Sequence, residues 1–247
     1  MERLRRKLAQ HGIDGSTVSP FLELDDGNIH RLVAPAEEAF RLWGQLRELV
    51  PRTGLWPVVV GDEQSVRLMV NQVTSDDFPP AAQLIEDGLA IDTGLWFTAM
   101  EEENPDFFER DLSGWQEPGP LRPTFESLMA SEEGERRDLS VALIPSPVSW
   151  HAPGHLRIGG WDTCPIAEVH VALLKRWHER YGADAMAISY DTIELHVARP
   201  PKDRAECEAL AWEHYVYCPP LVLQTEGGLG GLAASLLGSR RWLFSWD

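Results

Sequence analysis

The sequence predicts an α+β protein. Its 247 residues are 43% hydrophobic and 25% charged, which is the balance of an ordinary globular protein with a substantial core. From residue 139 onward, strand and helix patterns follow in the order strand, helix, strand, strand, helix, helix, strand. This order is close to a split βαβ or ferredoxin-like sandwich with one added helix, in which helices cover one face of an antiparallel sheet.

We divide the chain into an N-terminal α/β region, residues 1–138, and a C-terminal α+β domain, residues 139–247. The N-terminal region is the less regular half, and its acidic segment near residues 101–125 is rich in Pro and Gly, which predicts a linker. Phe107, Phe108 and Trp115 in this segment favour packing against the body of the protein, because disordered segments usually lack aromatic residues.

The N-terminal elements follow from hydrophobic spacing. Apolar residues at helical spacing predict a helix from Pro35 that ends near Pro51. The apolar run at residues 55–62 predicts a short buried strand, and residues 65–73 are a possible second strand. Two short helices are expected over residues 75–89 and 92–103, since each begins with acidic or small capping residues.

The C-terminal elements have clearer signals. The stretch LSVALIPSPVSW, residues 139–150, reads as a strand that its prolines end, and residues 166–181 read as an amphipathic helix that Gly182 stops. Residues 183–199 then predict two strands joined near Asp191. We also expect a helix that is capped at Asp203 and ends before Pro219, a short third helix, and a terminal strand.

Charge and cysteine usage restrict the partners and the compartment. The 22 basic and 39 acidic residues give a net charge of -17, which repels polyanions and argues against nucleic-acid binding. No run reaches the roughly 18 apolar residues of a membrane span, and no secretory signal is apparent, so we expect no membrane contact. Three cysteines without a repeating spacing do not predict a disulfide framework. We therefore expect a cytoplasmic protein.

Five stretches of the chain occur together in an order typical of one bacterial family. They are GLWPVVVGD, GGWDTCP, RWHERYGADAMAISYDTIELHVARPP, YVYCPP and LAASLLGSRRWLFSWD. With them the chain resembles the domain of unknown function 4253 family, over about residues 141–247 and more weakly upstream. The resemblance supports the expected fold and implies no particular reaction.

Cys164 is the main candidate for chemistry. It stands directly before Pro165 at the start of a predicted helix, where unpaired N–H groups and the helix dipole lower a thiol pKa. Together with Asp162 and His170, it would form the catalytic set of an enzyme. The alternative is a small buried residue that packs under Trp161.

Aromatic and histidine side chains in loops are the candidates for ligand binding. Such a groove for a peptide, a sugar or a protein would use Trp115, Trp150, His151, His155 and Trp161. We expect Trp177, Trp242 and Trp246 to lie in the core instead.

Metal and cofactor motifs are weak. His151, His155, Asp162 and Cys164 have the donor types that zinc accepts, but their spacing matches no recognised pattern, so we expect no metal. Cys207, His214 and Cys218 share one helix face and are more simply a core stripe. We find no dinucleotide, P-loop, zinc-protease or nucleophile-elbow motif, so no cofactor is expected.

Two functional hypotheses remain open. The first is a non-catalytic binding or accessory protein, such as an antitoxin or immunity protein, whose acidic surface recognises a basic protein or peptide. The second is a small-molecule enzyme with its site in the 150–170 loop, and it requires a pocket where that loop meets the sheet.

Overall fold

The computed structural model describes residues 2–24, 27–75, 78–104, 108, 110–115 and 137–246. The strands are β1 (Ser19–Leu24), β2 (Gly27–Pro35), β3 (Trp56–Gly61), β4 (Asp138–Ile144), β5 (Ala183–Ile188), β6 (Thr192–Val197) and β7 (Arg241–Ser245). The helices are α1 (Glu2–Ala9), α2 (Ala36–Thr53), α3 (Glu63–Ser75), α4 (Ala81–Ala90), α5 (Thr93–Glu103), α7 (Ala152–Leu156), α8 (Ala167–Tyr181), α9 (Arg204–Tyr217), α10 (Pro220–Gln224) and α11 (Gly228–Leu236). Two 3-10 turns, η1 (Gly15–Thr17) and η2 (Ser149–His151), complete the described elements.

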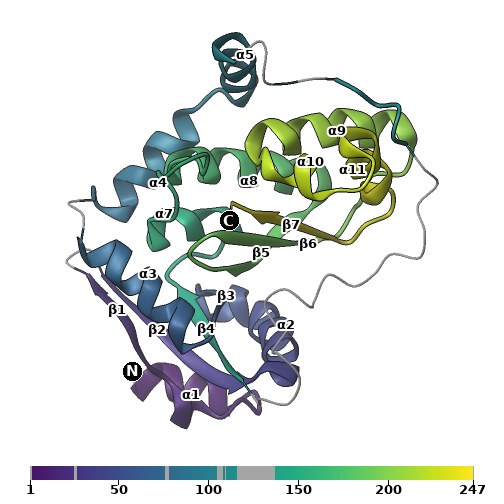
Figure 1. Ribbon diagram of the computed structural model, residues 1–247. Coiled ribbons are helices and arrows are strands. Elements are labelled where there is room, and N and C mark those ends of the chain that lie inside the picture. Colours follow the sequence, from purple (N-terminus) through teal and green to yellow (C-terminus); the bar gives the residue numbers. More distant parts are fainter. Residues whose placement is uncertain are drawn as a thin grey trace.

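The strands form one mixed seven-stranded sheet, in the order β1-β2-β4-β3-β5-β6-β7 (Figure 1). The predicted α+β class is confirmed. β4 pairs antiparallel with β2 and with β3, so the first strand of the C-terminal part lies between two strands of the N-terminal part. β3 pairs parallel with β5 and joins the two parts. The sheet is therefore continuous across the expected boundary between residues 138 and 139.

The connection from β4 through α8 to β5 has one feature of a split βαβ unit, because β3 lies between the two strands. The strand directions, however, differ from those of a split βαβ unit, in which the two connected strands are parallel. β4 is antiparallel to β3, and β3 is parallel to β5, so β4 and β5 run in opposite directions. The inserted strand β3 comes from the N-terminal region, which contributes to the same sheet.

The N-terminal region is more regular than its sequence indicated. β1 and β2 form a hairpin that hydrophobic spacing did not predict. The possible strand at residues 65–73 is wrong, because these residues belong to α3. Val66, Met69 and Val73 are buried at helical spacing, whereas Leu68 is 46% exposed. Among the described residues, no helix has the length and the apolar run that crossing a membrane requires.

Most of the predicted linker near residues 101–125 lies outside the described residues, including Phe107 and all of 116–125. Its described aromatics pack on α9. The Phe108 ring meets Tyr215 at 5.2 Å, and the guanidinium of Arg204 lies 4.8 Å from the centre of the Trp115 ring.

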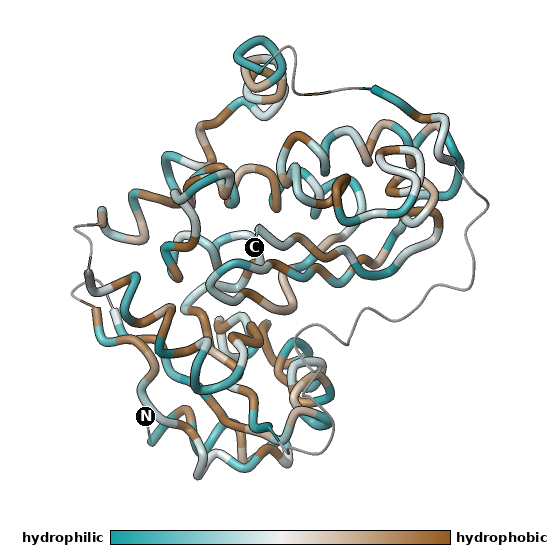
Figure 2. Tube along the Cα trace, viewed as in Figure 1, coloured by the Kyte–Doolittle hydropathy of each residue, from teal (hydrophilic) through white to brown (hydrophobic). Residues whose placement is uncertain are grey.

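Helices cover both faces of the C-terminal part of the sheet, so the expectation of one covered face is wrong. On one face, Trp177 of α8 stacks on Phe244 with the ring centres 5.3 Å apart, and Trp242 and Trp246 are buried nearby. The predicted core positions of these three tryptophans are confirmed. Cys207 and His214 of α9 are likewise buried, as is Cys218, which directly follows this helix. Figure 2 shows hydrophobic residues along the middle strands.

α2 lies on the opposite face. Side chains alternate between the two faces along a strand, and Asp184 of β5 is the cross-strand partner of His196 of β6. Trp43 of α2 packs on His196 with the ring centres 5.7 Å apart, and Arg47 of α2 pairs with Asp184. This face of the C-terminal strands therefore carries polar side chains beneath a helix of the N-terminal part.

Candidate functional site

The loop between α7 and α8 turns tightly around Cys164. Gly159, Gly160 and Asp162 have positive φ angles, and the Cys164 amide donates to the Trp161 carbonyl over 2.9 Å. The turn directs Cys164 toward the interior and leaves Trp161 half-buried. Gly159 is required here, because a Cβ at this position would overlap the Pro165 carbonyl and lie 2.7 Å from Nε2 of His170.

Two of the predicted catalytic residues come together in the core. Sγ of Cys164 lies 3.6 Å from Nε2 of His170, and Nδ1 of His170 lies 2.5 Å from the hydroxyl of Tyr217. Cys164 is only 4% exposed, and His170 and Tyr217 are fully buried. Asp162 is exposed at the turn, and no hydrogen bond in the described part of the chain joins it to either residue.

Burial determines how these groups ionise. It raises the pKa of the Cys164 thiol to about 12, and the carboxylate of Asp191 acts in the same direction. It lowers the pKa of His170 to about 3, although a hydrogen bond to the Pro165 carbonyl opposes this. Both groups are therefore neutral at neutral pH. The lowered thiol pKa that the helix position predicted is wrong, because burial away from water raises it.

Neutral His170 can satisfy both of its ring nitrogens. One nitrogen carries a proton and donates to the Pro165 carbonyl, and Nδ1 accepts from the hydroxyl of Tyr217. Through these bonds His170 connects the loop, α8 and α9. The geometry is that of a structural junction that holds the loop against the core.

A cleft of about 700 Å³ lies on the outer side of this loop, between it and helices α3 and α4. Trp161 stacks on Tyr190 at its edge, with the ring centres 5.3 Å apart and the planes 6° from parallel. Leu68 of α3 is 46% exposed in the cleft, and Ile166 of the loop is 51% exposed. Among the described lining residues, Glu168 is the only charged one.

Residues 140–247 match the model of the family described as Domain of unknown function (DUF4253). The match confirms the resemblance and covers β4 through β7, including the loop with Cys164. No curated protein and no solved structure matches the chain. The DUF4253 segment supplies Trp161, Ile166 and Tyr190 to the cleft, whereas Leu68 comes from the region upstream.

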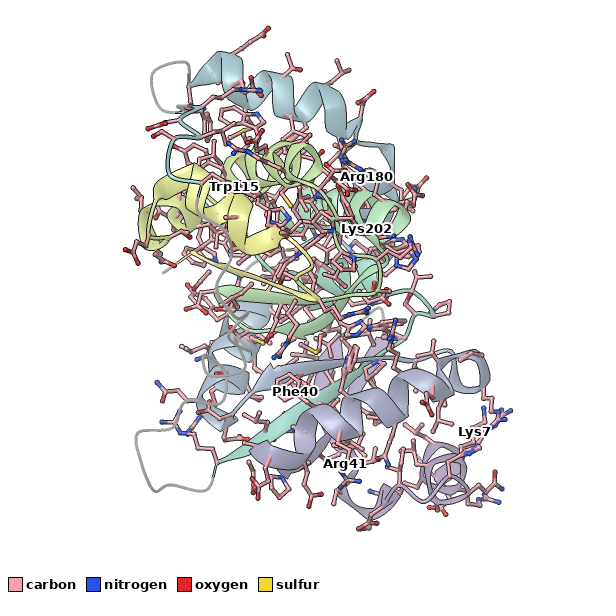
Figure 3. All side chains as sticks on the ribbon, turned by 90° about the vertical axis from the view of Figure 1, so that its right-hand side faces the viewer. Lys7, Phe40, Arg41, Trp115, Arg180 and Lys202 are labelled. Carbon is pink, nitrogen blue, oxygen red and sulfur yellow. The ribbon has the colours of Figure 1, made fainter. Side chains whose placement is uncertain are left out.

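The other predicted ligand-binding residues do not gather at this cleft. Trp115 lies against α9 and α11, far from Phe40 and Arg41 of α2 (Figure 3). Trp150 lines a separate cavity of about 320 Å³. His151 is half-buried, with Nδ1 3.0 Å from the Ser146 hydroxyl, and burial lowers its pKa. Of the predicted set, Trp161 alone lines the cleft.

The predicted donor types do not assemble into a metal site. His155 lies on the short helix α7, and Asp162 is exposed on the turn beyond it. In the described ranges of the chain, no three His, Cys, Asp or Glu side chains are placed to hold one ion.

Leu68 and Tyr190 were not recognised from the sequence. Leu68 stood in a segment that we interpreted as a strand. A helical interpretation would have placed it opposite the buried face of Val66, Met69 and Val73. Tyr190 follows β5 and carries no local signal, since its partner Trp161 lies about thirty residues earlier.

Proposed function

We propose that the chain is a non-catalytic binding protein that recognises a basic protein or peptide, and that the cleft beside Trp161 receives an apolar side chain of this partner. The observation that carries the proposal is the exposure of Leu68 and Ile166 in one cleft, next to a stacked Trp161–Tyr190 pair. Large apolar side chains exposed together in a concave surface are typical of binding sites.

Charge favours a basic partner. The chain has a net charge of -17, Glu168 lines the cleft, and no Lys or Arg is among the described lining residues. An acidic surface attracts a basic partner over distance and repels acidic ones. An antitoxin or immunity protein that captures a basic protein would have these properties. All three cysteines are buried, and no disulfide joins them in the described part of the chain, which is compatible with the reducing cytoplasm as its compartment.

The second candidate function is a small-molecule enzyme that uses Cys164, Asp162 and His170. Its support is the 3.6 Å contact between Cys164 and His170 beside a large cleft. Catalysis there would require the loop to open, because Cys164 is not among the described lining residues of the cleft and its thiol is protonated.

The binding proposal is tested with labelled peptides. One peptide carries Phe between Lys and Arg residues, and a second has the same Phe between Glu residues. We expect only the basic peptide to raise fluorescence anisotropy, with an affinity that weakens as salt is added. Leu68→Glu and Ile166→Glu should each weaken this binding at least tenfold.

Leu223→Glu is the matched control. Leu223 is 84% exposed on α10 and is not among the described residues of the cleft, so its replacement adds the same charge elsewhere. Equal weakening by all three variants would mean that the loss of binding is not specific to the cleft, and the cleft would then not be the binding site. Equal binding of both peptides would contradict the preference for a basic partner.

A further inference from the structure

The second cavity lies between α2, the beginning of β3, η2 and α8, and it shares none of its described lining residues with the cleft. Its volume is about 320 Å³, and its walls include the side chains of Arg47, Trp56, Trp150 and His178. A cavity of this size accommodates a small organic molecule. Two indoles and two nitrogen-rich side chains border one open pocket.

A buried carboxylate organises these side chains. Asp184 is 3% exposed and accepts hydrogen bonds from Nη2 of Arg47 at 2.5 Å, the Ser149 hydroxyl at 3.0 Å and Nδ1 of His178 at 2.8 Å. Burial would raise its pKa, but the hydrogen bond from His178 and the charge of Arg47 outweigh burial and lower it. Asp184 is therefore ionised at neutral pH and holds both side chains in place.

Arg47 is fixed on its other sides by aromatic rings. Its guanidinium carbon lies 5.4 Å from the centre of the Trp43 ring and 5.9 Å from that of Trp56. Nη2 bonds to Asp184, and in the described part of the chain Nη1 and Nε have no hydrogen-bond partner. The side chain is partly exposed where it borders the cavity. Arg47 thus presents N–H donors from a preorganised position.

His178 is fixed in a similar way. Nδ1 bonds to Asp184, which places Nε2 on the other side of the ring, and the ring centre of Trp150 lies 4.5 Å from that of His178. A planar group that enters the cavity meets the imidazole, the guanidinium and the indoles of Trp56 and Trp150 together.

We propose that this cavity binds a small aromatic carboxylate, with its carboxylate on the N–H groups of Arg47 and its ring against Trp56 and Trp150. The planar guanidinium matches a planar carboxylate, and indoles provide a flat apolar contact for a ring. Because ionised Asp184 balances the charge of Arg47, a monoanion is held by hydrogen bonds from the remaining N–H groups of Arg47, whereas the second charge of a phosphate dianion would be repelled by Asp184.

The probe is benzoate, and benzamide is the neutral molecule of nearly the same shape. Binding is followed by titration calorimetry and by ligand-observed NMR. We expect benzoate to bind at least tenfold more tightly than benzamide, and Arg47→Gln to weaken benzoate binding at least tenfold. Arg41→Gln is the matched control, because Arg41 is exposed on the same helix (Figure 3) and should leave binding within twofold.

A third variant keeps the test decisive if Arg47→Gln fails to fold. Val148 lines the cavity, so Val148→Trp fills it without changing charge and should remove benzoate binding. The proposal is overturned if benzoate does not bind the wild-type chain up to about 10 mM. It is also overturned if benzamide binds equally well, or if a folded Arg47→Gln or Val148→Trp variant binds benzoate like the wild type.

Discussion

Replacing Asp184 by Asn tests the polar cluster that joins α2, η2 and α8 to β5. The substitution keeps the shape of the side chain, but it removes the charge and turns one acceptor oxygen into a donor. Three donors, on Arg47, Ser149 and His178, then face a group that can satisfy fewer of them. The loss of folding stability should therefore exceed the loss that follows from removing one neutral hydrogen bond.

The magnitude follows from the burial of the three donors. Breaking a buried ion pair by removing one partner costs about 3–5 kcal/mol. Arg47 and His178 are about one-third exposed, so water compensates part of this loss. We expect Asp184→Asn to lower the free energy of unfolding by about 2–4 kcal/mol at pH 7.

Urea denaturation at several pH values measures this effect. The pKa of Asp184 is lowered in the folded chain, so its stabilisation is present above the unfolded pKa, near 4, and is lost as pH falls through the folded pKa. The difference in unfolding free energy between the wild type and Asp184→Asn should therefore become smaller in the same acidic range. Asp138→Asn, at an exposed position of β4, should change stability by no more than about 0.5 kcal/mol.

An Asp184→Asn variant as stable as the wild type at pH 7 would refute this reasoning. The cluster would then be incidental to the packing of α2 on the sheet. A loss that persists unchanged at low pH would also contradict it, because the effect would then come from shape and not from charge.

Three further predictions concern single buried positions. Iodoacetamide should modify Cys164 more slowly in the folded chain than in urea, because burial raises the pKa of its thiol to about 12. Mass spectrometry measures the two rates, and faster modification in the folded chain would contradict this prediction. Burial raises the pKa of Glu194 to about 7 despite its ion pair with Arg241, so this group stabilises the fold below its unfolded pKa and loses that contribution as pH rises toward 7. Glu194→Gln should remove a decline of roughly 2–3 kcal/mol in unfolding free energy across this range, and an unchanged pH profile would argue against the shift. Gly159→Ala should lower the melting temperature far more than Gly12→Ala. Both glycines have a positive φ, but of these two positions only Gly159 has other atoms within 4 Å of an added Cβ. Equal decreases in melting temperature would show that backbone strain alone causes the loss.

Local patterns were sufficient to predict α8, α9 and the C-terminal strands, but not the short helices α7 and α10. α8 carries apolar residues at helical spacing and ends at Gly182, which adopts the left-handed conformation expected of a helix stop. Asp203 caps α9 by accepting a hydrogen bond from the amide of Glu206, as its position before the helix predicts. These features depend on neighbours within a few residues, so a single sequence contains them.

The candidate site depends on distant neighbours instead. The predicted lowering of the Cys164 pKa considered only the nearby helix, but the thiol is enclosed with His170 and with Tyr217, which lies 47 residues beyond His170. Desolvation by such partners cannot be read from local spacing. The continuous sheet was missed for the same reason, since no local pattern indicates that β4 inserts between β2 and β3.

Both cavities lie where elements of the N-terminal region meet the DUF4253 segment. The cleft needs Leu68 of α3 as well as Trp161, and the second cavity needs Arg47 of α2 as well as His178. In the sheet, β4 has β2 and β3 as its neighbours, and both precede the matched residues. Residues 140–247 therefore form neither cavity alone and leave β4 without a partner on either edge. It follows that the N-terminal region determines what either cavity can bind, because it supplies one wall of each.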